Sequence, residues 1–195
     1  MRGIKEIYSR ISSWREADYS KDLWMNILLF YSFAIFGWCW EVMLHLIRDQ
    51  SFVNRGIMIG PWLPIYGFGG IILYQTLHRL TKAPVLIFLL ALIASTVLEY
   101  VSGWALEALF GVRWWDYSDH MVHLHGRVCL VGVFLFGIAG LLTVYLAVPV
   151  LTRCYRIINP KVRKIICLLI SAAFLIDALY SFIHPHMGKG ITGAL

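Results

Sequence analysis

Long apolar runs constrain this sequence more than any other feature. A helix that crosses roughly 30 Å of hydrocarbon needs about 20 mostly apolar residues, and five stretches of the 195-residue chain meet that requirement. They cover about residues 23–47, 57–77, 84–110, 128–151 and 165–183. The sequence therefore predicts an all-α fold, a polytopic bundle of about five transmembrane helices.

The composition excludes a water-soluble fold. Hydrophobic residues make up 59% of the chain and charged residues only 14%, whereas soluble domains carry about 25% charged residues. So few charged side chains cannot cover a soluble surface of this size, which excludes a soluble enzyme, a disordered protein and a free nucleic-acid-binding domain. The net charge of +6 reflects membrane topology, because the basic residues lie in short segments between apolar runs.

Lysine and arginine are distributed unevenly between the two sides of the predicted bundle. The segments before the first span, after the second and after the fourth together hold 12 of these residues, and the alternate segments hold 5. Cytoplasmic loops of membrane proteins are enriched in Lys and Arg. This asymmetry predicts a cytoplasmic N-terminus and an external C-terminus.

Two short segments flank the bundle, which we place at residues 23–183. In residues 1–22, apolar side chains recur at helical spacing among basic ones. This pattern fits a helix that lies on the inner leaflet, and a solvated cytoplasmic leader fits it equally well. Residues 184–195 form a short tail.

Glycines and prolines interrupt the second predicted span. They are Gly60, Pro61, Pro64, Gly67, Gly69 and Gly70. Pro64 lacks an N–H and its ring opposes the carbonyl of Gly60, so we predict that this span is not a straight helix over residues 60–67. Interrupted backbone at membrane depth is tolerated only against protein or a wet cavity, so Trp62 and Tyr66 are expected to face one of these and not lipid.

Four acidic residues lie inside predicted spans, where charge is costly and therefore marks functional candidates. They are Glu41, Glu99, Glu107 and Asp177. Glu99, Gly103 and Glu107 are spaced by four, so both carboxylates project from one helical face, about 12 Å apart along the axis. Such acids either line a polar cavity or are neutralised by basic partners and lock helix packing; for Asp177 we prefer the structural role.

Two arginines are candidate partners for these acids. Arg55, in VNRG, precedes the second span, and Arg127, in HGRVCL, precedes the fourth. The planar guanidinium fork suits carboxylates and phosphates. Each arginine is expected either to pair with Glu41 or Glu107 or to bind an anionic ligand.

The loop RWWDYSDHMVHLHGR is the densest cluster of polar and aromatic groups. Its aromatic residues, Trp114, Trp115 and Tyr117, fit an interfacial belt. Asp116 and the nearby histidines offer ligand atoms to a transition metal, but HxxHxH is not a standard ligand spacing. We therefore predict no metal site and no cofactor.

The sequence contains no familiar catalytic motif. GxSxG, HExxH and the Walker A glycine loop are all absent, so this chain cannot itself hydrolyse ATP by P-loop chemistry. The four cysteines occur singly, in or beside apolar runs. We interpret them as reduced packing residues.

Several short motifs occur in a defined order. They are GWCWE, FVNRG, GPWLPIYGFGG, RWWDYSD and GRVCL, with LEYVSGWALEALF before the last two. Over about residues 29–149 the chain resembles the CmpB-like ABC-transporter permeases, a family of small bacterial membrane proteins. The resemblance implies a bacterial inner-membrane location and a separate ATPase subunit, but it assigns no substrate and no residue roles. The chain departs from the family pattern at residues 121–124, where MVHL replaces a Pro-Phe-Asn-Leu-like run.

Three functional hypotheses remain open from the sequence. The first is a permease-like transport component with an intramembrane acidic site, which would need a second copy or a partner because five spans are few for a pore. The others are a membrane enzyme acting on a lipid or isoprenoid headgroup and a non-catalytic scaffold or sensor. Membrane lipids are expected partners and nucleic acid is not. The candidate path residues are Glu41, Arg55, Tyr66, Glu99, Glu107, Asp116 and Arg127.

Overall fold

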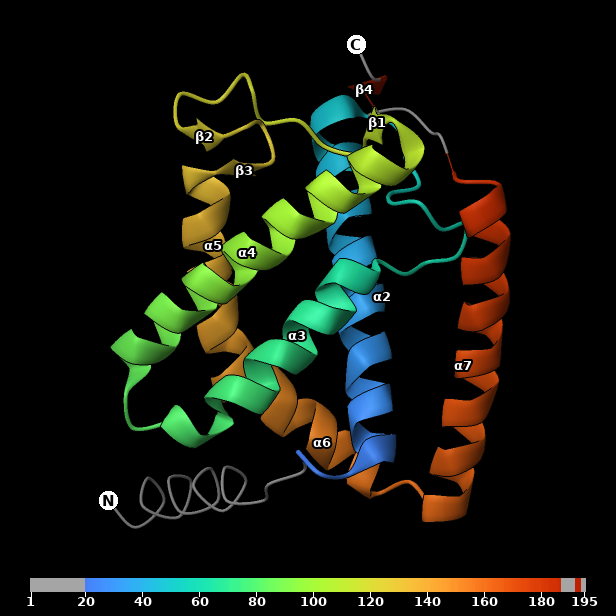
Figure 1. Ribbon diagram of the computed structural model, residues 1–195. Helices are drawn as coiled ribbons and strands as arrows, with labels where there is room; N and C mark the ends of the chain where they lie inside the picture. The colour runs from blue at the N-terminus through green and yellow to red at the C-terminus, as the bar shows by residue number, and fades with distance from the viewer. Residues whose placement is uncertain (1–19, 187–191, 194–195) are drawn as a thin grey trace.

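The computed structural model describes residues 20–186 and 192–193, so the amino-terminal leader lies almost entirely outside the described residues. The described chain is an all-α bundle, as predicted (Figure 1). Its helices are α2 (Leu23–Asp49), α3 (Pro64–Leu77), η1 (His78–Leu80), α4 (Pro84–Phe110), α5 (Leu130–Leu142), the π-helical turn η2 (Thr143–Ala147), α6 (Val148–Arg156) and α7 (Pro160–Ile183). Four two-residue strands accompany them: β1 (Val112–Arg113), β2 (His123–Leu124), β3 (Val128–Cys129) and β4 (Thr192–Gly193).

Four helices of the described chain are long and apolar enough to cross a membrane. They are α2 up to Arg48, α4, the continuous helix from Leu130 to Arg156, and α7. The predicted span 57–77 behaves differently, because only its second part is helical. With 14 residues, α3 rises about 21 Å, which is less than the thickness of the hydrocarbon core.

The irregular chain before α3 confirms that the second predicted span is not a straight helix. The position of Pro64 differs from the prediction, however, because it does not kink a helix that is already under way. It is the first residue of α3, where its missing N–H costs nothing and its fixed φ favours the helical start. The chain is attached just before this point, because the Leu63 N–H donates to the Ala34 carbonyl of α2 at 3.0 Å.

Local sequence signals account for the other helix ends. Asp22 caps α2 by accepting the Met25 N–H at 3.1 Å, and Asn159 caps α7 directly before Pro160. At the end of α4, Gly111 adopts φ 69° and its N–H donates to the Glu107 carbonyl. Glycine reaches this left-handed region without steric cost, so α4 ends where the loop toward α5 must turn.

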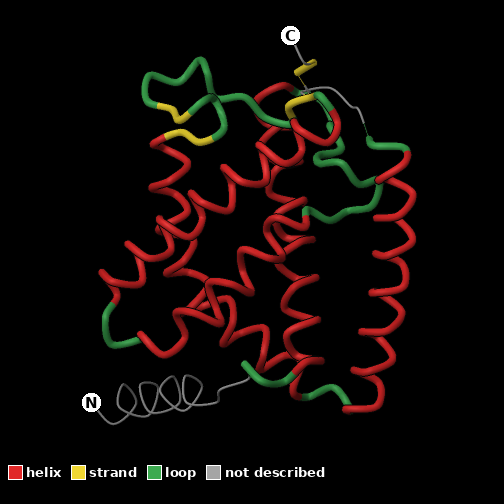
Figure 2. The backbone as a smooth tube through the Cα atoms, in the orientation of Figure 1, coloured by secondary structure: helices red, strands yellow, loops and turns green. Residues whose placement is uncertain are grey.

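The helices alternate in direction along the chain (Figure 1). The linker 50–63 and the loop 111–129 lie at one end of the bundle, which we call the loop-rich end (Figure 2). The α3–α4 connection and the α6–α7 turn lie at the opposite end with the start of α2. The central helix α2 contacts α3, α6 and α7, while α4 contacts α3 and α5.

Small residues bring these helices close together. Gly67 and Gly70 of α3 lie against the rings of Phe30 and Phe33 on α2, and Gly140 of α5 lies against Ala91 of α4. Because no hydrophobic force acts between helices in lipid, small residues that permit close van der Waals packing contribute to helix association. These contacts fix the packing of α3 on α2 and of α5 on α4.

Candidate functional site

The first polar group forms around Glu41 on α2. The Tyr66 hydroxyl donates to Oε1 of Glu41 at 2.6 Å, and Nε of Arg55 lies 3.8 Å from Oε2. The Tyr66 ring lies so close to Gly37, one turn before Glu41, that a Cβ at position 37 would clash with it. The start of α3 is therefore placed so that its phenol reaches the α2 carboxylate.

Glu99 of α4 lies beside this group and is 5% exposed. The Tyr117 hydroxyl faces its carboxylate as a hydrogen-bond donor, and the charge of Glu41 is close enough to act on it. Among the residues that the structure describes, no basic side chain pairs with Glu99, and its buried Oε2 has no hydrogen-bond partner. Four segments, α2, α3, α4 and the loop 111–122, thus converge on a carboxylate that lacks a counter-charge.

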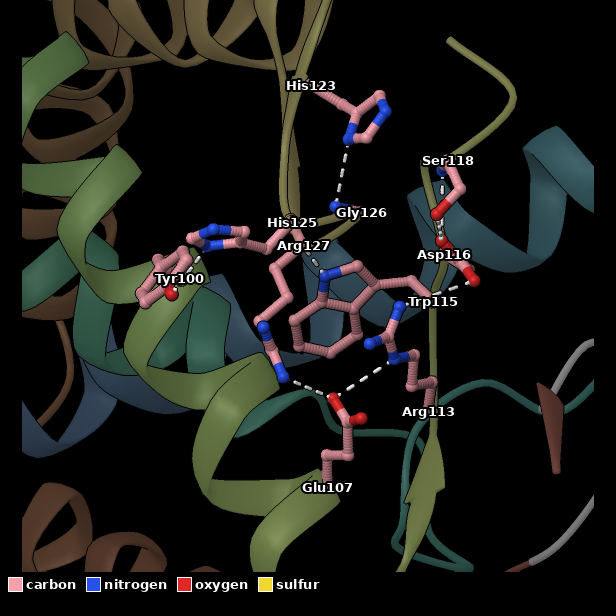
Figure 3. A network of polar contacts seen from close by, with 10 residues as sticks. All are labelled: Tyr100, Glu107, Arg113, Trp115, Asp116, Ser118, His123, His125, Gly126 and Arg127. Atoms are coloured by element: carbon pink, nitrogen blue, oxygen red, sulfur yellow. Dashed lines mark hydrogen bonds and ion pairs between the residues drawn. The ribbon is translucent and has the colours of Figure 1, made fainter. Parts of the chain in front are cut away.

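The second polar group forms around Glu107, near the end of α4. Arg127 and Arg113 approach its carboxylate from different parts of the loop (Figure 3). Nη2 of Arg127 and Nε of Arg113 lie 2.6 Å and 3.0 Å from Oε2. Nη1 of Arg113 also lies 3.5 Å from Oδ2 of Asp116. These contacts form a continuous ionic network that fastens the loop to α4.

The turn that follows Asp116 stabilises the ionised form of its side chain. Its Oδ1 accepts the Ser118 hydroxyl at 2.6 Å and the Ser118 N–H at 2.9 Å. The Ser118 hydroxyl and then the neighbouring Arg113 lower the pKa of Asp116 below its ordinary value. Gly126 passes close to this turn at φ 68°, and a Cβ there would meet Oδ1 of Asp116 at 2.5 Å.

Trp115 and Arg127 occupy the space at Gly103, between the two carboxylates of α4. A Cβ at Gly103 would meet the Trp115 ring at 3.2 Å and the Arg127 side chain at 3.5 Å. The Trp115 indole N–H also donates to the Arg127 carbonyl at 2.9 Å. Glu99 and Glu107 therefore share one helical face, as their spacing predicts, but belong to two separate groups.

The aromatic residues of the loop do not form the predicted interfacial belt. Trp114 is 3% exposed, and its carbonyl accepts a hydrogen bond from Nη2 of Arg55 at 3.4 Å. Tyr117 turns inward to Glu99, and both burial and the Glu99 carboxylate raise the pKa of this phenol. The sequence did not mark Tyr117 as a site residue. The available signal was its place in WWDYS, next to Asp116 and four residues after Arg113.

Asp177 of α7 binds the irregular chain that precedes α3. Its carboxylate accepts the N–H groups of Ile59 at 3.2 Å and Gly60 at 2.8 Å. It also accepts the Trp62 indole N–H at 2.6 Å and the Ser181 hydroxyl at 2.9 Å. This supports the structural role for Asp177, and it confirms that Trp62 faces protein; Tyr66, bound to Glu41, does so too.

The histidines of the loop have individual partners. His123 Nδ1 accepts the Gly126 N–H at 3.0 Å, and His125 Nδ1 lies 2.9 Å from the Tyr100 hydroxyl, as Figure 3 shows. Within residues 20–186 and 192–193, no three His, Cys, Asp or Glu side chains gather as metal ligands.

The fold and its intramembrane acids define a polytopic membrane protein. Residues 28–182 match the family described as "Putative ABC-transporter type IV", CmpB type, and the chain belongs to that family. The match extends the resemblance found from the motifs almost to the end of α7. No curated protein and no solved structure matches the chain.

Proposed function

We propose that the chain is the membrane-embedded permease component of a transport system in the bacterial inner membrane. The observation that supports this most directly is the uncompensated carboxylate of Glu99 within a membrane-spanning helix. Ionisable residues inside a membrane are costly and mark substrate or ion pathways. The discontinuous second segment, in which α3 begins after irregular chain, is also a feature from which transporter sites are built.

The two polar groups take different roles in this proposal. The path group consists of Glu41, Arg55, Tyr66, Glu99 and Tyr117. These residues surround Glu99, which among the described residues has no basic partner and, unlike Asp177, keeps a buried carboxylate oxygen without a hydrogen bond. Glu107, Arg113, Asp116 and Arg127 form the anchoring group, because their charges already satisfy one another. The anchoring group then holds the loop 111–122 across the loop-rich end of the path.

The proposed transport function requires an ATPase subunit and further membrane helices. Because its sequence has no Walker A loop, ATP-driven transport requires a separate ATPase subunit, in line with the family to which the chain belongs. The few helices of one chain make a second copy or another membrane subunit necessary for a continuous path. The excess of Lys and Arg at the end opposite the loop-rich end favours a cytoplasmic N-terminus.

Deletion and complementation in the source bacterium test the proposal. Mass spectrometry of cells and medium is expected to reveal a solute whose distribution changes on deletion and is restored by the wild-type gene. Glu99→Gln is expected to reach the membrane at the wild-type level without restoring the distribution. Leu109→Ala, a change on the exposed face of the same helix, serves as the matched control and is expected to restore it.

Two outcomes contradict transport. Either no solute changes its distribution on deletion, or Glu99→Gln restores every change as fully as the wild type. Copurification of an ATPase whose activity depends on the wild-type chain supports the ATP-driven form. A changed lipid profile without any solute change favours a headgroup-modifying enzyme instead.

A further inference from the structure

We propose that the species bound at Glu99 is a proton and that Tyr117 controls its exchange with the loop-rich end. This inference rests on the proposed function, because it names the ion that the path group carries. It joins two observations that arise from different parts of the chain. One is the buried carboxylate without a counter-charge, and the other is a phenol that reaches it from an anchored loop.

The path group contains two carboxylates and one arginine, so one further positive charge is needed to balance it. Arg55 is engaged with Glu41 and with the Trp114 carbonyl, so it does not compensate Glu99. The titratable groups that act on Glu99 or on the Tyr117 phenol are Glu41 of α2, Tyr66 of α3 and Cys129 of β3. Arg55 of the linker contacts Glu41 in the same group. With both carboxylates ionised the group carries a net negative charge, and such a buried charge is strongly unfavourable unless a cation joins it.

The oxygen atoms around Glu99 suit a proton better than a metal cation. Hard metal cations take several oxygen ligands, six or more for Ca²⁺ and Mg²⁺. Oε2 of Glu99 is buried and without a protein partner among the described residues, while the nearest hydroxyls, those of Tyr66 and Tyr117, donate to carboxylates. A proton needs only one oxygen, and Oε2 of Glu99 offers one that no described residue already occupies.

The anchoring of Tyr117 makes this phenol a gate. The backbone N–H of Tyr117 donates to the Gly126 carbonyl at 2.7 Å. The preceding residue, Asp116, belongs to the ionic network of Arg113 and Glu107. The carbonyl of Trp114 accepts a hydrogen bond from Arg55. Tyr117 is therefore held between Glu99 and the loop-rich end. An ionised carboxylate accepts a stronger hydrogen bond than a protonated one, so proton binding at Glu99 loosens the contact that closes the site.

Carbodiimide labelling of the purified full-length chain in nanodiscs tests the proton. The reagent dicyclohexylcarbodiimide reacts with protonated carboxyl groups in apolar surroundings, and peptide mass spectrometry locates the adduct. We expect Glu99 to be the main labelled carboxyl, with labelling slowed by raising the pH and unaffected by Na⁺ or K⁺ at constant pH. Glu107, paired with two arginines on the same helix, is the internal control. Preferential labelling of Glu107, no adduct on Glu99, or protection by Na⁺ or K⁺ would overturn the proposal.

A matched pair of tyrosine variants tests the gate. With a water-soluble carbodiimide, Tyr117→Phe is expected to be labelled at Glu99 several-fold faster than the wild type. Tyr100→Phe removes a phenol from α4 that faces His125, and it is expected to keep the wild-type rate. Equal rates in all three proteins would overturn the gating role. Because labelling requires no substrate, a proton at Glu99 is established or rejected independently of the transport experiment.

Discussion

Nη2 of Arg127 lies 2.6 Å from Oε2 of Glu107, and this contact joins the residue before β3 to the last turns of α4. Eight residues earlier on the same helical face, Glu99 has no such partner among the described residues. Two identical side chains on one helix are thus in opposite electrostatic surroundings. We therefore expect substitution of Glu107 to affect mainly stability and substitution of Glu99 to affect mainly function.

Neutralising the two acids of α4 is expected to affect stability unequally. Glu107→Gln leaves Arg127, which is 14% exposed, and Arg113 without their shared counter-charge, and we expect a loss of about 1–3 kcal/mol. Glu99→Gln removes a carboxylate that has no cationic partner and should change stability little. Thermal unfolding in the same detergent measures both variants. An equal or larger decrease in Tm for Glu99→Gln would contradict this assignment.

Removing the charge of Asp177 is expected to release the chain before α3. Asp177→Asn weakens hydrogen bonds from two backbone N–H groups and the Trp62 indole, so we expect a loss of about 1–3 kcal/mol. Hydrogen exchange of residues 57–63 should accelerate. Ser181→Ala removes only one of the donors and should have a smaller effect. Unchanged exchange in Asp177→Asn would show that α7 does not hold this segment.

The turn at Asp116 is expected to lose stability in acid. Because the pKa of Asp116 is lowered in the folded state, the stabilisation is fully present above the unfolded value of about 3.9 and is lost as the pH falls through the lower folded value. Ser118→Ala removes the largest cause of the shift and should move this loss to higher pH. The difference in Tm between the wild type and Asp116→Asn, followed against pH, measures the effect. A pH-independent difference would contradict it.

The two ends of the bundle are expected to face opposite sides of the membrane. In a variant without native cysteines, Asp119→Cys in the loop and Lys161→Cys at the start of α7 place exposed thiols at the two ends. An impermeant maleimide should label position 119 in intact cells and position 161 only after permeabilisation. The reverse pattern would place the N-terminus outside.

Four of the five predicted spans and their approximate ends agree with long apolar helices of the described chain, because length, apolarity and capping residues act within a single segment. The second predicted span is helical only from Pro64 onward. The break before α3 was predictable for the same reason, since glycine and proline act on the local backbone. Spacing by four likewise placed Glu99 and Glu107 on one face. The structure differs from the prediction at Pro64. A proline can kink a helix or begin one, and Pro64 begins α3.

Partnerships between side chains were decided only by the tertiary structure. The sequence by itself determined that Glu41, Glu99, Glu107 and Asp177 lie in apolar segments and need compensation. The helix packing decided that Glu107 receives two arginines and that Asp177 receives the chain before α3. It also decided that Glu99, within the described part of the chain, receives the Tyr117 phenol and no basic side chain. The physical reason is that a charged contact depends on distances of a few ångströms between atoms of different segments, and close packing at glycines such as Gly37 and Gly103 sets those distances.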